Sequence, residues 1–124
     1  MKKLFLTLLL SISSIGQAGV SEVTCEEVLK EAKNVKLIDV RTAEEFYHSD
    51  GHVEGAKRVT LGPELTTFLK EGNPKEKIIF ICRSGKRSSQ AVAQSRDLGY
   101  EATSSMAGGM LRWKQLGYPT TQKD

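Results

Sequence analysis

The sequence predicts one α/β domain built on a mainly parallel β-sheet. Segments with the pattern of strands alternate with segments with the pattern of helices, an order typical of βαβ units. The segment "IIFIC" (78–82) is continuously apolar and rich in β-branched residues, as expected of a strand buried on both faces of a parallel sheet. A chain of 124 residues can enclose one hydrophobic core of modest size.

The first elements of the predicted domain are marked by a helix cap and an apolar run. Thr24 followed by Glu27 forms a capping-box pattern, which predicts an amphipathic helix through about Lys33. The segment "VKLIDV" (35–40) then predicts a strand, and a short helical turn is expected over 43–47.

The later elements follow the same alternation of strands and helices. Pro63 is suited to a first helical turn and Gly72 to a helix end. Ser88 or Ser89 can cap a further helix that runs through Leu98. The remaining expected elements are a short strand over 57–61, a last strand over 101–107 and a final helix over 110–117.

The first eighteen residues have the pattern of a secretory signal. Lys2 and Lys3 form a basic start, an apolar stretch covers 4–15, and "GQA" (16–18) is a small-x-small cleavage site. A membrane anchor is the alternative, but a spanning helix needs about 20 apolar residues. We therefore expect a signal peptide at 1–18 and an exported domain at 19–124, periplasmic or secreted and without stable membrane insertion after cleavage.

Charge and cysteine content narrow the possible functions. The whole chain has a net charge of +3, and loss of Lys2 and Lys3 leaves 16 basic and 15 acidic side chains, so we expect no nucleic-acid partner. Cys25 and Cys82 are two cysteines in a chain expected to enter an oxidising compartment. The two cysteines could form one disulfide with each other. Alternatively, at least one of them remains a free thiol that takes part in a reaction.

The segment "CRSGKRS" (82–88) combines a thiol at a strand end with three nearby cations. Ligand sites in a parallel α/β sheet gather at the carboxyl ends of the strands, where Cys82 is placed. A short loop that leads into a helix turns its N–H groups inward, and the helix start adds partial positive charge. Arg83, Lys86 and Arg87 add to this charge, and Gly85 allows a tight turn. Taken alone, the segment "IIFIC" could end in an unreactive cysteine of the hydrophobic core. The cations that follow Cys82 favour instead a thiolate that binds an anionic ligand.

Four segments in order resemble the motifs of single-domain rhodaneses, a family of sulfurtransferases. They are "LIDVRTAEEF" (37–46), "GHVEGA" (51–56), "CRSGKRS" (82–88) and "MAGGMLRWKQLGYP" (106–119). The chain departs from the family pattern at Glu54, where proline is common, and in a longer "YHSDGH" segment. The resemblance implies a central five-stranded, mainly parallel sheet with helices on both faces and the strand order 1-5-4-2-3.

The resemblance also implies an activity and a set of site residues. Cys82 would attack the sulfane sulfur of a small anionic donor such as thiosulfate, hold it as a persulfide, and pass it to a thiophilic acceptor, cyanide or a thiol. No metal and no organic cofactor is implied. Related phosphatases have the longer pattern C-x5-R, whereas Arg87 here gives C-x4-R, which favours sulfur over phosphate. The substrate-binding loop would be Arg83, Ser84, Gly85, Lys86, Arg87 and Ser88.

Asp39 and Arg41 follow the same strand and are expected at the same edge of the sheet, as supporting residues. We expect Arg41 to form an ion pair with Glu44 or Glu45. His52, by resemblance, belongs to a structural loop rather than serving as a base for Cys82.

Two other classes of function remain open. One is a noncatalytic binding module of the same fold, and the other is a thiol redox protein that uses Cys25 with Cys82. The implied strand order places the two cysteines too far apart for a disulfide.

Overall fold

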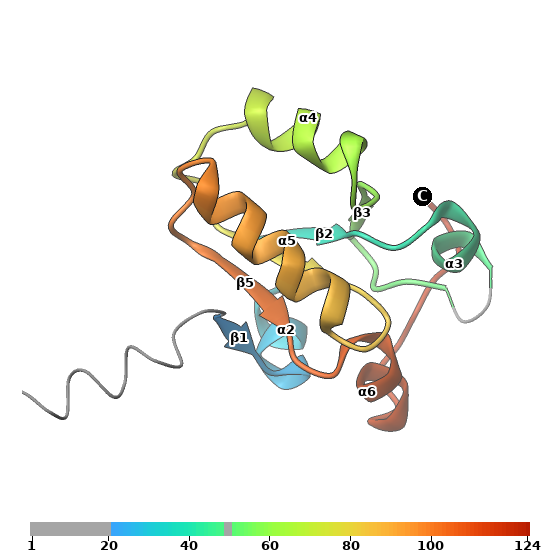
Figure 1. The fold of residues 1–124 in the computed structure, drawn as a ribbon. Coiled ribbons are helices and arrows are strands. Elements are labelled where there is room, and N and C mark those ends of the chain that lie inside the picture. Colours follow the sequence, from blue (N-terminus) through green and yellow to red (C-terminus); the bar gives the residue numbers. More distant parts are fainter. Residues whose placement is uncertain (1–20, 49–50) are drawn as a thin grey trace, which may run out of the picture.

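The computed structural model describes residues 21–48 and 51–124, which form a five-stranded sheet with helices on both faces (Figure 1). The predicted signal peptide, 1–18, lies outside the described residues. The strand order is β1-β5-β4-β2-β3, and every pair of neighbours is parallel. The predicted fold class and strand order are confirmed. The strands are β1 (Glu22–Val23), β2 (Lys36–Asp39), β3 (Lys57–Arg58), β4 (Ile78–Ile81) and β5 (Thr103–Met106).

The central strand β4 divides the core into two layers. All four of its residues are buried, and alternate side chains point to opposite faces of the sheet. Ile79 and Ile81 join one cluster, which includes Trp113, and Ile78 and Phe80 join the other. The helices α2 (Cys25–Glu31), α3 (Ala43–Tyr47) and α6 (Gly109–Gln115) supply the first cluster, while α4 (Pro63–Glu71) and α5 (Lys86–Asp97) supply the second.

The helix α5 begins earlier than the sequence predicts. We expected Ser88 or Ser89 as its N-cap, and this is wrong, because Gly85 is the N-cap. Gly85 has a φ of 105°, a left-handed conformation that glycine adopts without steric cost. The two serines lie in the first turn instead, where the Ser89 hydroxyl donates to the Gly85 carbonyl at 2.7 Å and the Ser88 Oγ lies 3.2 Å from the same oxygen.

The carboxyl ends of β2 and β4 lie side by side. Asp39 is the register partner of Ile81, and the Val40 N–H donates to the Ile81 carbonyl at 2.9 Å. The segments that follow these strands, Val40–Arg41 and Cys82–Gly85, therefore leave the sheet at one edge, where α5 begins. This edge is the place at which parallel α/β sheets bind ligands.

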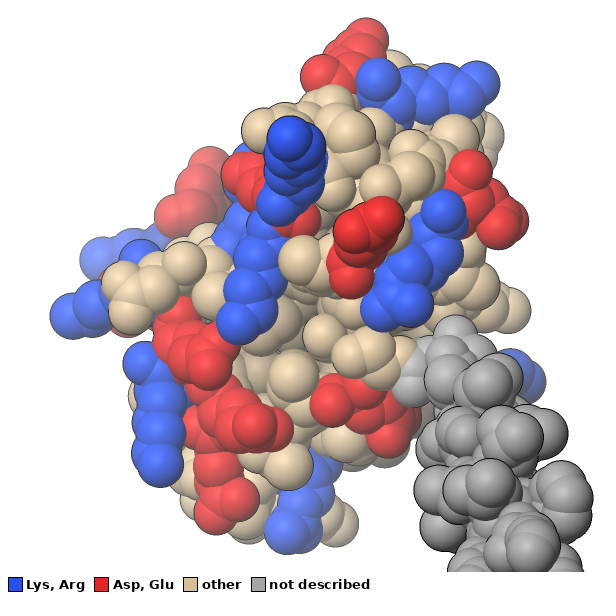
Figure 2. Space-filling model, turned by 90° about the vertical axis from the view of Figure 1, so that its left-hand side faces the viewer, with Lys and Arg blue, Asp and Glu red and all other residues tan. Residues whose placement is uncertain are grey.

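The surface carries both signs of charge. On the face shown in Figure 2, Lys and Arg side chains lie among Asp and Glu side chains and do not gather into a patch of one sign. Within 21–48 and 51–124, no helix has the length and apolar character needed to cross a bilayer.

Candidate active site

The Cys82 thiol is buried at the end of β4 and is surrounded by backbone donors. Its side chain is 1% exposed. The N–H of Gly85 donates to Sγ at 3.0 Å, and the N–H of Ser88 donates to it at 3.3 Å. Donors that are fixed around a sulfur atom favour its negatively charged form, and the start of the 12-residue helix α5 adds partial positive charge in the same place.

Two hydroxyl groups extend this environment toward β5. The Ser88 Oγ lies 3.4 Å from the Cys82 Sγ, and the Ser105 Oγ lies 2.6 Å from the Ser88 Oγ. Ser105 was not anticipated from the sequence, because nothing in "EATSSMA" indicates which of its polar side chains faces the thiol.

The final helix holds the outer side of the Cys82 loop. The Met110 N–H donates to the Cys82 carbonyl at 2.9 Å, and the Leu111 N–H donates to the Arg83 carbonyl at 3.0 Å. Gly109 makes this approach possible, since a Cβ there would lie 2.4 Å from the Arg83 oxygen, and its φ of 59° is also left-handed. The Gly108–Gly109 turn therefore places the last helix against the thiol loop.

The three loop cations have different surroundings. The Arg87 guanidinium forms two bonds of 2.9 Å with the Glu45 carboxylate, which also caps α3 through Thr42. The hydrogen bonds from Arg87 are the main reason that the pKa of Glu45 falls from 4.5 to about 2. Arg83 and Lys86 are exposed, and neither forms an ion pair with any residue that the structure describes. These two cations remain available to an anionic ligand.

Asp39 and Arg41 form a buried ion pair at the end of β2. Arg41 Nε donates to Asp39 Oδ1 and Nη2 donates to Oδ2, each at 2.9 Å, and Nη2 also donates to the Gly51 carbonyl. The expected pairing of Arg41 with Glu44 or Glu45 is therefore wrong. Arg41 folds back on the strand end because the Asp39 carboxylate is 0% exposed and needs a charged partner there. Glu45 pairs with Arg87 instead.

His52 has a structural environment rather than a position beside the thiol. Its ring is 1% exposed and stacks on Phe46 with centroids 3.5 Å apart. The ring Nδ1 lies 2.7 Å from the Phe46 carbonyl oxygen, and its backbone pairs with Thr121. Among the described residues, no three His, Cys, Asp or Glu side chains gather as metal ligands.

The second cysteine lies in the other core layer. Cys25 belongs to the cluster under α2 and α6, whereas Cys82 belongs to the cluster under α4 and α5, and both thiols are free. Burial is the main reason that the pKa of the Cys25 thiol is raised. The Cys25 thiol is therefore poorly suited to redox exchange with Cys82.

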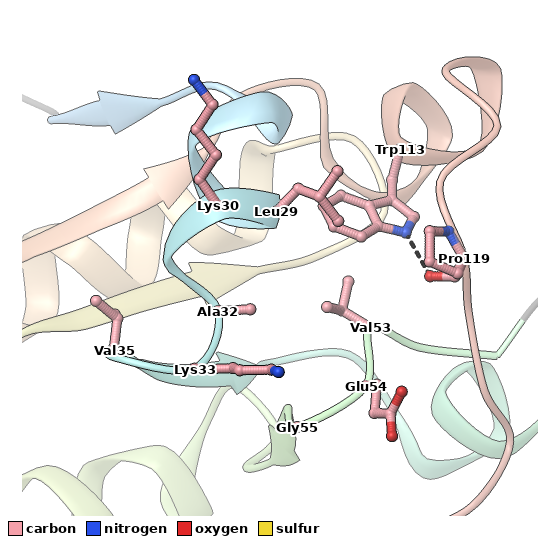
Figure 3. A pocket seen from close by; sticks show the side chains of 10 residues that line it. All are labelled: Leu29, Lys30, Ala32, Lys33, Val35, Val53, Glu54, Gly55, Trp113 and Pro119. Carbon is pink, nitrogen blue, oxygen red and sulfur yellow. Dashed lines mark hydrogen bonds between the residues drawn. The ribbon is translucent and has the colours of Figure 1, made fainter.

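A groove on the surface of the domain lies away from the Cys82 loop. It has a volume of about 950 Å³ and lies between α2, the segment Val53–Gly55 and Pro119, which follows α6 (Figure 3). The Trp113 indole at its side donates to the Pro119 carbonyl at 2.9 Å. None of its lining residues belongs to the Cys82 loop.

The family description "Rhodanese-like domain" matches residues 24–116 of the chain. The chain is 32% identical over 102 residues to thiosulfate sulfurtransferase 18 of Arabidopsis thaliana, covering 72% of this chain and 74% of the relative. It is 30% identical over 104 residues to a sulfurtransferase of Allochromatium vinosum, covering 81% and 94%. It is also 33% identical over 94 residues to an uncharacterized protein of Synechocystis sp., covering 76% of this chain and about half, 51%, of that protein.

Solved structures share the fold of the chain. A rhodanese-like domain protein from Staphylococcus aureus matches with a TM-score of 0.69 and 25% sequence identity, over 82% of this chain and 99% of that one.

The Glu45–Arg87 pair predicts a pH-dependent contribution to stability. Because the pKa of Glu45 is lowered to about 2, the contribution is fully present above about pH 5 and is lost as the pH falls through 2. We expect Glu45→Gln, which can still cap α3, to lower the free energy of unfolding at pH 7 by about 1 kcal/mol, since the pair is partly exposed. Urea unfolding measures this, and the difference from wild type should shrink toward zero near pH 2.

Glu44→Gln is the control for that experiment, because Glu44 lies in the same helical turn without an ion pair to a described residue. It should change the stability little at any pH. A deficit of Glu45→Gln that stays constant from pH 7 to pH 2 would contradict the assignment.

Proposed function

Because the chain belongs to the family of rhodanese-like domains, we propose that it moves sulfane sulfur from an anionic donor of the thiosulfate type to a thiophilic acceptor, through a persulfide on Cys82. The family and the sulfurtransferases among its relatives support sulfur transfer in general. The observation that carries the finer proposal is the Cys82 sulfur itself, buried at a strand end with the N–H groups of Gly85 and Ser88 at 3.0 and 3.3 Å.

The first half of the proposed reaction loads the sulfur. The Cys82 thiolate attacks the outer sulfur of thiosulfate, a new S–S bond forms, and the bond within the donor breaks so that sulfite leaves with its electron pair. The N–H groups of Lys86 and Arg87 lie in the first turn of α5 and so have no partner within the helix. They are left to stabilise the negative charge of the outer sulfur, as an oxyanion hole would.

The second half returns the enzyme to its starting state. Cyanide or a thiolate attacks the outer sulfur of the persulfide, and the Cys82 thiolate leaves with the electron pair of the broken S–S bond. No net oxidation or reduction of Cys82 takes place over the cycle, and no proton acceptor beyond the solvent is needed once the thiolate has formed. This agrees with the position of His52 in a structural contact.

The two exposed cations define the proposed entrance for the donor. Arg83 and Lys86 are exposed in the loop that holds the Cys82 sulfur, whereas the charge of Arg87 is offset by Glu45. Attraction of a doubly charged anion therefore depends mainly on Arg83 and Lys86. The name of the thiosulfate sulfurtransferase among the relatives supports thiosulfate as the donor.

We also propose that residues 1–18 are a secretory signal and that the domain over 19–124 works outside the cytoplasm, in the periplasm or after secretion. The basic, apolar and small-residue segments of the sequence support this. On expression of the full chain in a bacterium with two membranes, we expect a periplasmic product that begins at Gly19 by intact mass. A full-length product that stays with the membrane fraction would instead favour an anchor.

The proposed persulfide predicts a mass change that depends on Cys82. Wild-type protein treated with thiosulfate should gain the mass of one sulfur atom, lose it on addition of cyanide, and gain it again in a second round. Cys82→Ser should fold and yet show no gain, because a serine hydroxyl is far too weakly acidic to attack as an anion. Intact-mass spectrometry after removal of the small molecules measures each step.

Cys25→Ser is the matched control, since it removes the other free thiol. It should keep the full cycle. Labelled sulfur on Cys25, or turnover by Cys82→Ser, would contradict the proposal. Either result would favour a noncatalytic binding module of the same fold.

The loop cations predict a dependence on the charge of the donor. Arg83→Ala combined with Lys86→Ala should lower kcat/KM for thiosulfate roughly tenfold and leave an uncharged sulfane donor much less affected, because only the anion is attracted by these side chains. Steady-state kinetics at two salt concentrations measure this. Equal losses for both donors would show that the cations act mainly on the thiol.

A further inference from the structure

Two buried hydroxyl groups connect Cys82 to the neighbouring strand β5. Ser88 on α5 and Ser105 on β5 are both 0% exposed, so bulk water does not supply their hydrogen bonds. The Ser88 Oγ has three neighbours, the Ser105 Oγ at 2.6 Å, the Gly85 carbonyl oxygen at 3.2 Å and the Cys82 Sγ at 3.4 Å. The position of each hydroxyl proton follows from counting donors and acceptors.

The hydroxyl proton of Ser105 has one available acceptor among the described residues. Among residues 21–48 and 51–124, the one hydrogen-bond partner of the Ser105 hydroxyl is the Ser88 Oγ. If Ser88 donated to Ser105, the Ser105 proton would be buried without an acceptor, which is costly. Ser105 therefore donates and Ser88 accepts.

The proton of Ser88 must then point to the Gly85 carbonyl or to the sulfur. The Gly85 oxygen already accepts the Ser89 N–H at 3.1 Å and the Ser89 hydroxyl at 2.7 Å. A carbonyl oxygen has two lone pairs, and both are used by these shorter bonds. The remaining acceptor for the Ser88 proton is the Cys82 sulfur.

We propose that Ser105 is a positioning residue for the reacting sulfur, because it fixes the Ser88 hydroxyl as a third hydrogen-bond donor to Cys82, beside the N–H groups of Gly85 and Ser88. A hydrogen bond to a charged acceptor is stronger than one to a neutral acceptor, so this donor stabilises the thiolate more than the thiol. The inference rests on the proposed role of Cys82 as the sulfur carrier. Ser88 contacts the sulfur, and Ser105 acts through it.

The structure offers a matched control at the same packing interface. Ser95 and Thr103 form a second hydroxyl pair between α5 and β5, with their oxygens 2.8 Å apart and both residues buried. This pair lies two helical turns from Ser88. Removal of a hydroxyl there tests the cost of losing such a pair without any contact with Cys82.

Alkylation of Cys82 by iodoacetamide, measured from pH 5 to pH 10 in a Cys25→Ser background, tests the proposal without any sulfur transfer. We expect Ser105→Ala and Ser88→Ala each to lower the alkylation rate at pH 7 roughly tenfold relative to the rate reached at high pH. Thr103→Val should leave this ratio unchanged, although it removes a buried hydroxyl at the same interface. Thermal unfolding of each variant confirms that it is folded.

The charged groups around the sulfur stay the same in all of these variants. They are Arg87 with its partner Glu45, the buried pair of Asp39 and Arg41, and the exposed Arg83 and Lys86. A change in the alkylation profile is therefore due to the hydroxyl groups.

A double variant separates action through Ser88 from independent action. If Ser105 works through Ser88, then Ser88→Ala with Ser105→Ala should be no worse than Ser88→Ala alone. Additive losses, an unchanged profile for Ser105→Ala, or an equal change for Thr103→Val would each overturn the proposal. Alkylation reports only on the reactivity of the Cys82 thiol. A failure of the proposed role of Ser105 is therefore distinguishable from a failure of the proposed sulfur transfer.

Discussion

In the function we propose, one physical constraint organises the site: a sulfur atom buried at the end of a strand has to be stable with a negative charge. Such a charge is costly in a core unless hydrogen-bond donors are directed at it. The short loop after β4 supplies them from Gly85 and Ser88, and it does so only in the backbone conformation that Gly85 permits. The neighbouring elements fix this loop: α5 continues from it, β5 lies behind Ser88, and α6 binds its outer carbonyls.

The charged residues near the site fall into two groups with different tasks. Asp39 with Arg41, and Glu45 with Arg87, are paired and hold the segments after β2 and β4 in place. Arg83 and Lys86 are exposed and face solvent. The loop therefore attracts anions with two cations rather than three, because the Glu45 carboxylate from α3 offsets the charge of Arg87.

Much of the fold could be predicted from the sequence, because its signals are local. The apolar run of β4 and the capping box at Thr24 specify a strand and a helix without reference to distant residues. Interactions between distant residues could not be predicted in this way. The Arg87–Glu45 pair spans 42 positions and the Ser88–Ser105 contact spans 17. The N-cap at Gly85 was missed because serine is the more usual cap, and only the turn itself shows that glycine is required.

The order of the strands also has a consequence for biosynthesis. The strand β1, near the start of the chain, pairs with β5, near its end, and the carbonyls of Cys82 and Arg83 are bound by Met110 and Leu111. A nascent chain that is still growing has an incomplete sheet and a thiol loop without its outer support. Contacts so distant in sequence also form slowly. The sheet is therefore completed late, and the Cys82 loop gains its outer support only after the segment through Leu111 has left the ribosome.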